Sequence, residues 1–350
     1  MADNKTTIFD FFNYRILSFY NEIKLLKAGK MPPPRMAILH LTSGCNHNCE
    51  GCDYRIQNKV KKILTPEQND YIISQLIEAG VEAVEFAGGG EPLIDPYVPA
   101  MLYKLKAHGL ATDVLTNGGL MFGKTLEAII DCCSFIRISL EAGSNEIFQK
   151  VKQIDNPKEF PKIINNIREA IRLKKEKNKT LNINIKFTVG KKNYQDMENA
   201  IQLAASLGVD SIQFKLYENA PGVQLTPGEA AAVAVKLKKL KDKYQGEVRI
   251  IGNLIKTAIY HQCWLCSFYT VIDVWGNIYL CSYYHHRPDA HKIGNIFEKS
   301  FKEIWGSEKH WTAIKNIDIK KCNLYDCRFH FYNAFWDKII DENSDDLKFI

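Results

Sequence analysis

The sequence lacks several features that would assign it to a class at once. No apolar run approaches the roughly 18 to 20 residues that a membrane-crossing helix needs. The N-terminus lacks the basic-then-apolar order of a secretory signal, and no low-complexity tract or convincing internal repeat is present. These absences predict a cytoplasmic protein with no transmembrane segment. Neither sign of charge dominates, since 46 Lys and Arg face 40 Asp and Glu, so nucleic acid is not expected as a partner.

The composition is that of an ordinary globular protein. Hydrophobic residues make up 46% and charged residues 25% of the 350 positions, which excludes disordered and fibrous classes. The length allows one large domain or two of ordinary size. In a reducing compartment, the ten cysteines are expected to be metal ligands or reactive thiols rather than a disulfide framework.

Residues 1–35 form an N-terminal extension that is expected to be helical. Phe9 to Lys27 carries large apolar side chains at roughly helical spacing, and Gly29 with the run Pro32–Pro34 ends the pattern. We expect this helix to pack on its own domain. A weak contact with a membrane surface is the alternative.

From residue 36 onward, β-rich runs alternate with helical segments. This order predicts an α/β fold with right-handed crossovers and a parallel sheet, open or closed into a barrel. Reactive groups in such sheets lie on loops that follow the C-terminal ends of the strands. The expected strands are Ala37–Thr42, Val81–Phe86, Ala111–Leu115, Phe135–Leu140, Leu181–Val189 and Asp210–Leu216, and the expected helices are Thr65–Ala79, Tyr97–His108, Lys124–Cys132, Pro161–Lys174 and Asn193–Leu207.

After Leu216 the alternation stops. Residues 221–258 are expected to form a linker and a helix over Glu229–Tyr244, and residues 259–350 a small cysteine-rich α+β domain. Within that domain, Tyr269–Val274 and Ile278–Leu280 read as a hairpin. Short helices are expected near Phe297–Trp305 and Phe331–Ile340.

Three cysteines, Cys45, Cys49 and Cys52, lie in the loop directly after the first expected strand. Three thiolates on a short loop can hold a [4Fe–4S] cluster and leave one iron without a protein ligand. An open coordination position is typical of catalytic metal centres. The alternative is a zinc site in which His47 supplies the fourth ligand.

The C-x3-C-x2-C loop and three further segments resemble the radical S-adenosylmethionine (radical SAM) superfamily. The resemblance spans about residues 36–216 and implies a partial (β/α)6 TIM-like barrel, expected over 36–220, that binds S-adenosylmethionine and generates a 5′-deoxyadenosyl radical. It implies that the Gly-Gly-Glu element holds the methionine amino group and that Ser139 contacts the ribose. The implied cofactor-binding residues are Gly88, Gly89, Gly90, Glu91, Thr116, Asn117, Ser139 and Glu141.

One position departs from the family pattern. The residue before the third cysteine is often aromatic in the family and helps to hold adenine, but here it is Gly51. Tyr54, just beyond the loop, is the expected substitute in the cofactor pocket.

A second set of cysteines resembles the SPASM or shorter twitch extension of radical SAM enzymes, which binds auxiliary iron–sulfur clusters. Five cysteines favour one auxiliary [4Fe–4S] cluster. The preferred ligands are Cys266, Cys281, Cys322 and Cys327, with Cys263 as a spare thiol; alternatively, Cys263 is a ligand and another cysteine is released. A structural zinc site of four cysteines is the remaining interpretation.

The resemblance implies hydrogen abstraction from an unactivated C–H bond, with electrons from a flavodoxin- or ferredoxin-type donor. If the auxiliary cluster accepts the second electron, dehydrogenation of a sugar-like or other small metabolite follows, or crosslink formation on a peptide by a maturase. If a thiol returns hydrogen, with Cys263 as the candidate donor, the product is an epimer. The short N-terminal extension argues modestly against a peptide substrate, because it leaves no room for a peptide-recognition domain. A zinc-stabilised binding module without activity is the alternative from a different class.

Overall fold

The computed structural model describes residues 15–54, 60–217, 220–252, 254, 261–321, 327 and 329–340. Its centre is a ten-stranded sheet in the order β10-β9-β8-β1-β2-β3-β4-β5-β6-β7. Strands β1 to β8 all run parallel, whereas β9 and β10 are antiparallel to their neighbours. The strands are β1 Met36–Leu39, β2 Ala83–Phe86, β3 Ala111–Thr116, β4 Phe135–Ser139, β5 Asn182–Val189, β6 Ser211–Leu216, β7 Arg249–Ile251, β8 Tyr269–Ile272, β9 Asn277–Tyr279 and β10 Lys292–Asn295.

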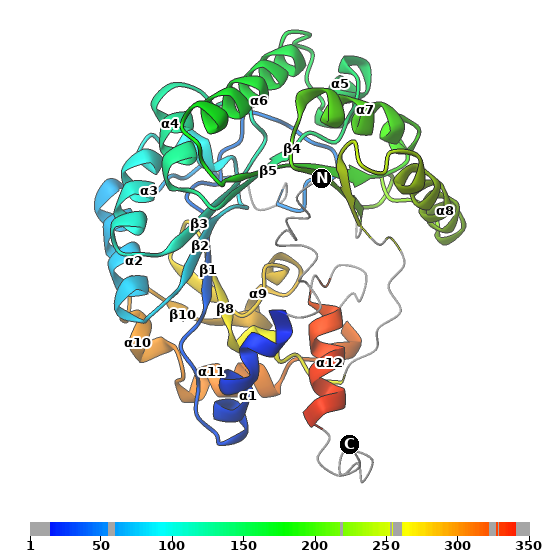
Figure 1. The fold of residues 1–350 in the computed structure, drawn as a ribbon. Helices are drawn as coiled ribbons and strands as arrows, with labels where there is room; N and C mark the ends of the chain where they lie inside the picture. The colour runs from blue at the N-terminus through cyan, green and yellow to red at the C-terminus, as the bar shows by residue number, and fades with distance from the viewer. Residues whose placement is uncertain are drawn as a thin grey trace.

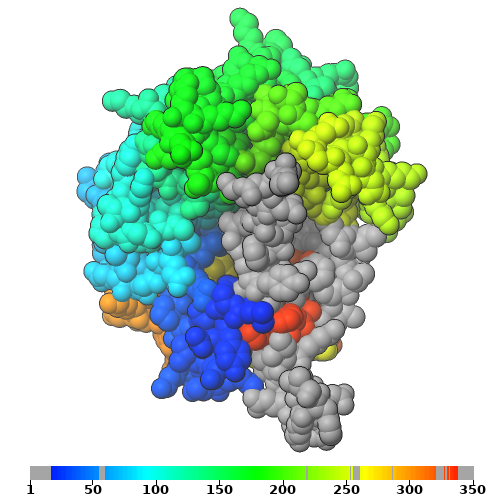
Figure 2. Space-filling model, viewed as in Figure 1, coloured from blue at the N-terminus to red at the C-terminus, as the bar shows by residue number. Residues whose placement is uncertain are grey.

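Helices cover the outer face of this curved sheet, as a partial TIM-like barrel requires (Figure 1). In the space-filling view, the surface that is coloured from cyan through green to yellow curves around the left, top and right of the molecule (Figure 2). Among the described residues, none of the helices is long and apolar enough to cross a bilayer. The α-helices are α1 Tyr20–Lys27, α2 Pro66–Glu78, α3 Val98–Ala107, α4 Gly123–Cys132, α5 Asn145–Lys152, α6 Glu159–Glu176, α7 Met197–Leu207, α8 Pro227–Lys243, α9 Pro288–His291, α10 Phe301–Ile304, α11 Glu308–Lys315 and α12 His330–Ile340.

The six expected strands and the helices between them are confirmed, with ends shifted by a few residues. Helix α2 shows why the local signal was strong. The Thr65 hydroxyl accepts from Gln68 N and the Gln68 side chain accepts from Thr65 N, a capping box that satisfies two free amide groups of the first turn. Pro66 at the first helical position has no N–H to satisfy.

Three features were not expected from the sequence. Helix α5 lies in a stretch for which no helix was predicted, and the three-residue β7 lies inside the predicted linker region 221–258. The expected hairpin of the cysteine-rich domain is β8 and β9, but β8 also pairs in parallel with β1, from Met36 opposite Tyr269 to Leu39 opposite Ile272. This pairing uses the edge of β1 that would otherwise stay unpaired. The C-terminal strands therefore continue the barrel sheet.

The expected N-terminal helix is α1, preceded by the 3-10 turn Arg15–Phe19; residues 1–14 of that prediction lie outside the described part. Ile23 of α1 packs with Leu265, Phe268 and Trp336 in a separate small core. Arg35 anchors the same segment, because its Nε donates to the Glu22 carboxylate over 2.7 Å. The helix thus packs on its own protein, as expected.

Candidate functional site

The first cysteine loop begins just past the C-terminal end of β1. Its base is closed by main-chain carbonyls: Thr42 Oγ1 donates to Lys62 O over 2.9 Å and Ser43 Oγ donates to Val60 O over 2.6 Å. Burial raises the pKa of the Cys49 thiol to about 12, and nearby Lys152 offsets only part of that rise. A partly buried thiol in this setting becomes a thiolate when a metal ion replaces its proton.

The glycine triplet after β2 packs directly against this loop. Gly90 N donates to Thr42 O over 2.7 Å, and Glu91 N donates to Gly44 O over 2.9 Å. A Cβ on Gly90 would lie 1.8 Å from Gly44 O, so no side chain fits. Gly88 and Gly89 have φ of 52° and 67°, which favours glycine. The triplet holds the cysteine loop against β2, a role that the sequence did not indicate.

Glu91 links the end of β2 to the end of β3. It is 3% exposed, and its carboxylate accepts hydrogen bonds from Leu93 N (3.1 Å), Thr116 Oγ1 (2.5 Å) and Asn117 N (2.7 Å). Burial raises the pKa of Glu91 to about 7, although these three donors oppose the rise. Two other predicted cofactor residues, Thr116 and Asn117, therefore contact Glu91 directly. Contact of any of them with a methionine amino group stays a prediction.

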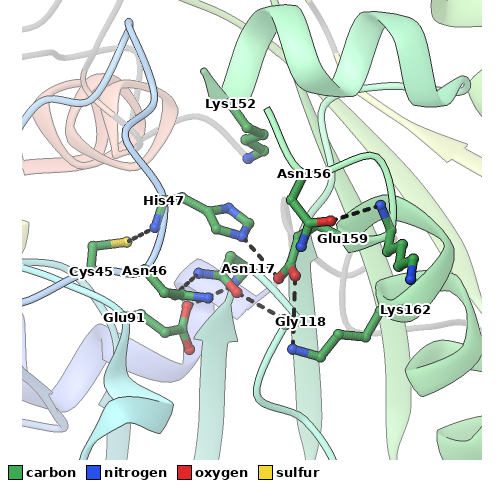
Figure 3. A network of polar contacts seen from close by, with 12 residues as sticks. Cys45, Asn46, His47, Glu91, Asn117, Gly118, Lys152, Asn156, Glu159 and Lys162 are labelled. Carbon is green, nitrogen blue, oxygen red and sulfur yellow. Dashed lines mark hydrogen bonds and ion pairs between the residues drawn. The ribbon is translucent and has the colours of Figure 1, made fainter. Parts of the chain in front are cut away.

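Polar contacts continue from Asn117 toward the cysteine loop (Figure 3). Asn117 Nδ2 donates to Asn46 Oδ1 over 2.7 Å, next to Cys45. The ring of His47 points away from Cys45, and its Nε2 lies 3.4 Å from Glu159 Oε1 of α6. Burial lowers the pKa of His47 to about 3, so the ring is neutral. This orientation does not suit His47 to the zinc alternative.

A buried ion pair lies on the other side of the loop. Lys152 of α5 is 2% exposed, and its Nζ donates to Ser139 O over 2.7 Å and to Glu141 Oε2 over 2.8 Å. Thr188 and Tyr217 also donate to the Glu141 carboxylate. Burial alone would raise the pKa of Glu141, but the charges of Lys152 and nearby lysines hold it below its usual value. Two predicted cofactor residues, Ser139 and Glu141, are thus held by one lysine that sequence reasoning missed.

Backbone strain marks the same position. Glu141 has φ of 62°, an uncommon conformation for a residue other than glycine. Asn193, 1% exposed, holds it there, because its Nδ2 donates to Glu141 O and to Thr188 O, each over 2.9 Å. Such strain persists only where the surroundings enforce it, and it concentrates at functional sites.

Tyr217, one residue beyond β6, occupies the space beside Gly51. A Cβ on Gly51 would lie 2.4 Å from Tyr217 Cε1, and one on Gly190 would lie 2.8 Å from Tyr217 Cδ2. The ring is therefore enclosed between two glycines. Tyr217, rather than Tyr54, is the aromatic side chain that lies next to Gly51.

Tyr54 instead connects the two cysteine-bearing regions. Its hydroxyl donates to Ser282 O over 3.2 Å, adjacent to Cys281, and its ring contacts His40 and His285 at centroid distances of 5.1 and 4.9 Å. The predicted contact of Tyr54 with adenine stays untested, but its ring is committed to this aromatic group.

The C-terminal cysteines gather near one another. Cys266 Sγ donates to Cys263 O over 3.0 Å. Burial raises the pKa of Cys281 to about 12, and Cys263 and Cys327 lie close enough to add to that rise. Asn333 of α12 donates to Cys263 Sγ over 3.7 Å. Cys263 thus lies among the other candidates; the predicted ligand Cys322 falls outside the described residues.

Within the described ranges, no three His, Cys, Asp or Glu side chains converge around a point that would suit a single metal ion. Cysteines around an iron–sulfur cluster each bind a different iron, so their sulfurs lie farther apart than around one ion. The three thiols of this loop are partly buried and their pKa values are raised, and such soft ligands fit an iron–sulfur cluster. The polar groups at the ends of β2, β3 and β4 fit a small zwitterion beside it.

Comparison with known proteins decides the family. The model of the radical SAM superfamily matches residues 39–216, just over half of the chain. The chain belongs to the radical SAM superfamily. A second model, the SPASM iron–sulfur cluster-binding domain, matches residues 263–328. This radical SAM enzyme therefore uses a [4Fe–4S] cluster with S-adenosylmethionine and an auxiliary iron–sulfur cluster. The zinc-stabilised binding module without activity is set aside.

Solved structures share this fold. The chain superposes on Streptococcus suis SuiB bound to precursor peptide SuiA with a TM-score of 0.66, at 15% identity, covering 86% of this chain and 71% of SuiB. It superposes on anSMEcpe with bound AdoMet and Cp18Cys peptide with a TM-score of 0.62, at 18% identity, covering 86% and 88%. At these identities, the likeness concerns the fold alone.

Curated relatives match over shorter stretches. A probable GTP 3′,8-cyclase of Sulfurisphaera tokodaii is 27% identical over 176 residues, which cover 49% of this chain and 52% of that protein. An S-adenosylmethionine-dependent nucleotide dehydratase of a Thermoplasmatales archaeon is 29% identical over 108 residues, or 31% and 38%. The chain thus spans about half, or less, of the length of these relatives.

Proposed function

We propose that this radical SAM enzyme dehydrogenates a sugar-like or other small metabolite, as an oxidoreductase. When bound, S-adenosylmethionine and the clusters supply a 5′-deoxyadenosyl radical and an acceptor for the second electron. The observation that carries the proposal is the Tyr54–Ser282 contact of 3.2 Å, which joins the two cysteine-bearing regions. An electron acceptor close to the site of hydrogen abstraction favours net oxidation.

The chain's own residues have distinct roles in this proposal. Cys45, Cys49 and Cys52 hold the cluster of the barrel, and the glycine triplet holds their loop against β2. Glu91 orients the ends of β2 and β3 through its three accepted hydrogen bonds. Thr116, Asn117, Ser139 and Glu141 complete the cofactor pocket.

Tyr217 takes the place of the aromatic side chain that Gly51 lacks. Its ring lies against Gly51, and its hydroxyl donates to the Glu141 carboxylate over 3.2 Å. A ring that is held between two glycines and by its hydroxyl can present a fixed edge to adenine. We assign the contact with adenine to Tyr217. Tyr54 instead connects the two cysteine-bearing regions.

The auxiliary cluster takes Cys263 as a ligand in this proposal. Cys263 lies with Cys266, Cys281 and Cys327, and its sulfur accepts a hydrogen bond from Asn333. Cys322 is then the alternative ligand of the auxiliary cluster. A ligand is a poor hydrogen donor, so this choice argues against the epimerase alternative.

The names of the curated relatives support a small substrate. Both carry a nucleotide or nucleoside triphosphate in their names. The solved structures of SuiB and anSMEcpe carry peptides, so a crosslink-forming peptide maturase is the second candidate. A flavodoxin- or ferredoxin-type protein supplies the reducing electron in either case.

The test uses anaerobically reconstituted, cluster-loaded enzyme with dithionite and S-adenosylmethionine. Candidate sugars, sugar phosphates, nucleotides and peptides carry deuterium at non-exchangeable carbons. With a small metabolite as substrate, we expect deuterium in 5′-deoxyadenosine. The product should lack two hydrogen atoms of the substrate, one of which is the transferred deuterium. Deuterium transfer from peptides alone, or an isomer of unchanged mass as product, would reject the proposal. Cys45→Ala is the control that abolishes transfer.

A further inference from the structure

The C-terminal end of helix α5 is attached to the first cysteine loop. Asn48 N, between Cys45 and Cys49, donates to the carbonyl oxygen of Lys152 over 3.3 Å. A second contact adjoins the first, because Asn48 Nδ2 donates to Gln153 Oε1 over 3.5 Å. The last residue of α5 is therefore fixed against the loop that holds the [4Fe–4S] cluster of the barrel, the barrel cluster.

Lys152 brings a buried positive charge to this loop. Its side chain runs from α5 toward the loop that carries Cys45 and His47 (Figure 3), and the residue is 2% exposed. Burial lowers the pKa of Lys152, but the nearby Cys49 and Glu141 outweigh burial and raise the pKa above its usual value. The ammonium group therefore keeps its charge at neutral pH.

The charge of Lys152 acts on two of the three barrel cysteines. Burial raises the pKa of Cys49, Lys152 opposes that rise, and Glu141 adds to it less strongly. Burial also raises the pKa of Cys45, where Glu91 adds to the rise and Lys152 opposes it. Lys152 thus stabilises negative charge on these sulfurs, whereas the two carboxylates destabilise it.

The ion pair with Glu141 does not cancel this effect. The charged atoms of the pair are 2.8 Å apart, yet Lys152 acts on Cys49 more strongly than Glu141 does. Lys152 Nζ also donates to Ser139 O over 2.7 Å, which fixes the ammonium group in its place. The pair therefore has a net positive effect at Cys49.

Net charge and hydrogen bonds to the sulfurs both set the reduction potential of an iron–sulfur cluster. His47 N donates to Cys45 Sγ over 3.4 Å, and Lys152 supplies a charge. Reduction adds one electron to a cluster, so a nearby cation stabilises the reduced form more than the oxidised form. Solvent ions screen buried charges much less than exposed ones.

We propose that Lys152 raises the reduction potential of the barrel cluster and so eases its reduction by a one-electron donor. Lys152 acts through its charge alone and transfers neither an electron nor a proton. Glu141 has the opposite effect, because its carboxylate lowers the potential. The inference goes beyond the proposed function, since it concerns the electron that enters the cluster and holds for any substrate.

A redox titration tests the inference without turnover. Anaerobic, cluster-loaded protein without S-adenosylmethionine is titrated with dithionite and mediators, and electron paramagnetic resonance follows the reduced clusters. Cys45→Ala, which removes a ligand of the barrel cluster, identifies the signal of that cluster by difference. The auxiliary cluster serves as an internal standard in every sample.

Lys152→Met should shift the potential of the barrel cluster downward. We expect the equilibrium constant for its one-electron reduction to fall about tenfold, which corresponds to about 59 mV. The auxiliary cluster should keep its parental potential. The matched control is Lys150→Met, since Lys150 lies on the same helix with a side chain that is 56% exposed; it should shift neither potential.

Glu141→Gln gives the test an opposite sign. This variant removes a negative charge and keeps Lys152, so the potential of the barrel cluster should rise. The double variant with Lys152→Met should lie between the two single variants. Loosened packing would not move the potential in opposite directions for the two members of one ion pair.

Iron content and circular dichroism confirm that each variant is folded and holds both clusters. If Lys152→Met loses the barrel cluster, the potential of Glu141→Gln decides, and a rise supports the inference. A parental potential in Lys152→Met, an equal fall at the auxiliary cluster, or a parental or lower potential in Glu141→Gln would overturn it.

Discussion

Replacing Lys152 by Met tests whether a buried ion pair holds the cofactor pocket together. Lys152 and Glu141 are 2% and 8% exposed at their side chains, with their charged atoms 2.8 Å apart. At an effective dielectric constant of about 20, two charges at that distance attract by about 6 kcal/mol. The cost of desolvating both ions cancels much of this gain, but removal of one partner leaves a buried carboxylate. We expect Lys152→Met to lower the free energy of unfolding by about 3–5 kcal/mol.

The assay is urea unfolding of anaerobic, cluster-loaded protein followed by circular dichroism. Lys150, on the same helix, is the matched control, because its pair with Glu146 is 2.6 Å long but 56% and 76% exposed. Lys150→Met should leave the free energy of unfolding nearly unchanged, because exposed ion pairs contribute little. Adding Glu141→Gln to Lys152→Met should restore part of the loss, because the two residues are coupled. If Lys152→Met costs under about 1 kcal/mol, or no more than Lys150→Met, the reasoning is refuted.

Three further predictions concern single positions. Gly51→Ala should weaken the binding of S-adenosylmethionine, because the new Cβ would lie 2.4 Å from the Tyr217 ring. Equilibrium dialysis measures the affinity, and an unchanged affinity would contradict the proposed contact of Tyr217 with the cofactor. Glu91→Gln should lower the free energy of unfolding in urea by about 1–3 kcal/mol, because the side-chain NH₂ of the glutamine then faces a backbone N–H. An unchanged unfolding midpoint would contradict this. Burial lowers the pKa of His310 to about 4, so His310 takes up a proton at higher pH in the unfolded chain than in the folded one. Its own contribution to the free energy of unfolding should fall by up to about 1.4 kcal/mol per pH unit from pH 6.5 to 4. His310→Asn, which keeps an acceptor for Gly306 N, should make the slope in this pH range less steep by that amount; an unchanged slope would contradict the prediction.

Much of the fold could be predicted because each strand and helix carries its own local signal. Helix α2 has a capping box and a proline at its first position, and the long β5 has a run of apolar side chains at alternate positions. The strand β7 was missed because three residues are too few for a period to emerge. Helix α5 was missed although Ser144 at its N-cap and Glu146 in its first turn are typical of a helix start, because eight residues give only two turns of apolar periodicity.

The partners of the site residues could not be predicted in the same way. Glu91 and the three barrel cysteines belong to short motifs that stand together in the chain. Lys152 belongs to no motif, and it reaches Glu141 only because α5 folds back over the end of β4. No signal in the chain identifies it, apart from its place on a helix with one apolar face.

The spacing of residues along the chain was therefore sufficient to predict the order of strands and helices, the two cysteine groups and the superfamily. Each of these depends on residues that are close in sequence. Folding alone brought Tyr217 against Gly51, joined Tyr54 to Ser282 and paired β8 with β1. These contacts join residues that are 166, 228 and more than 200 positions apart. At such separations a contact depends on how the sheet curves and how its side chains pack, and no local pattern of residues records either.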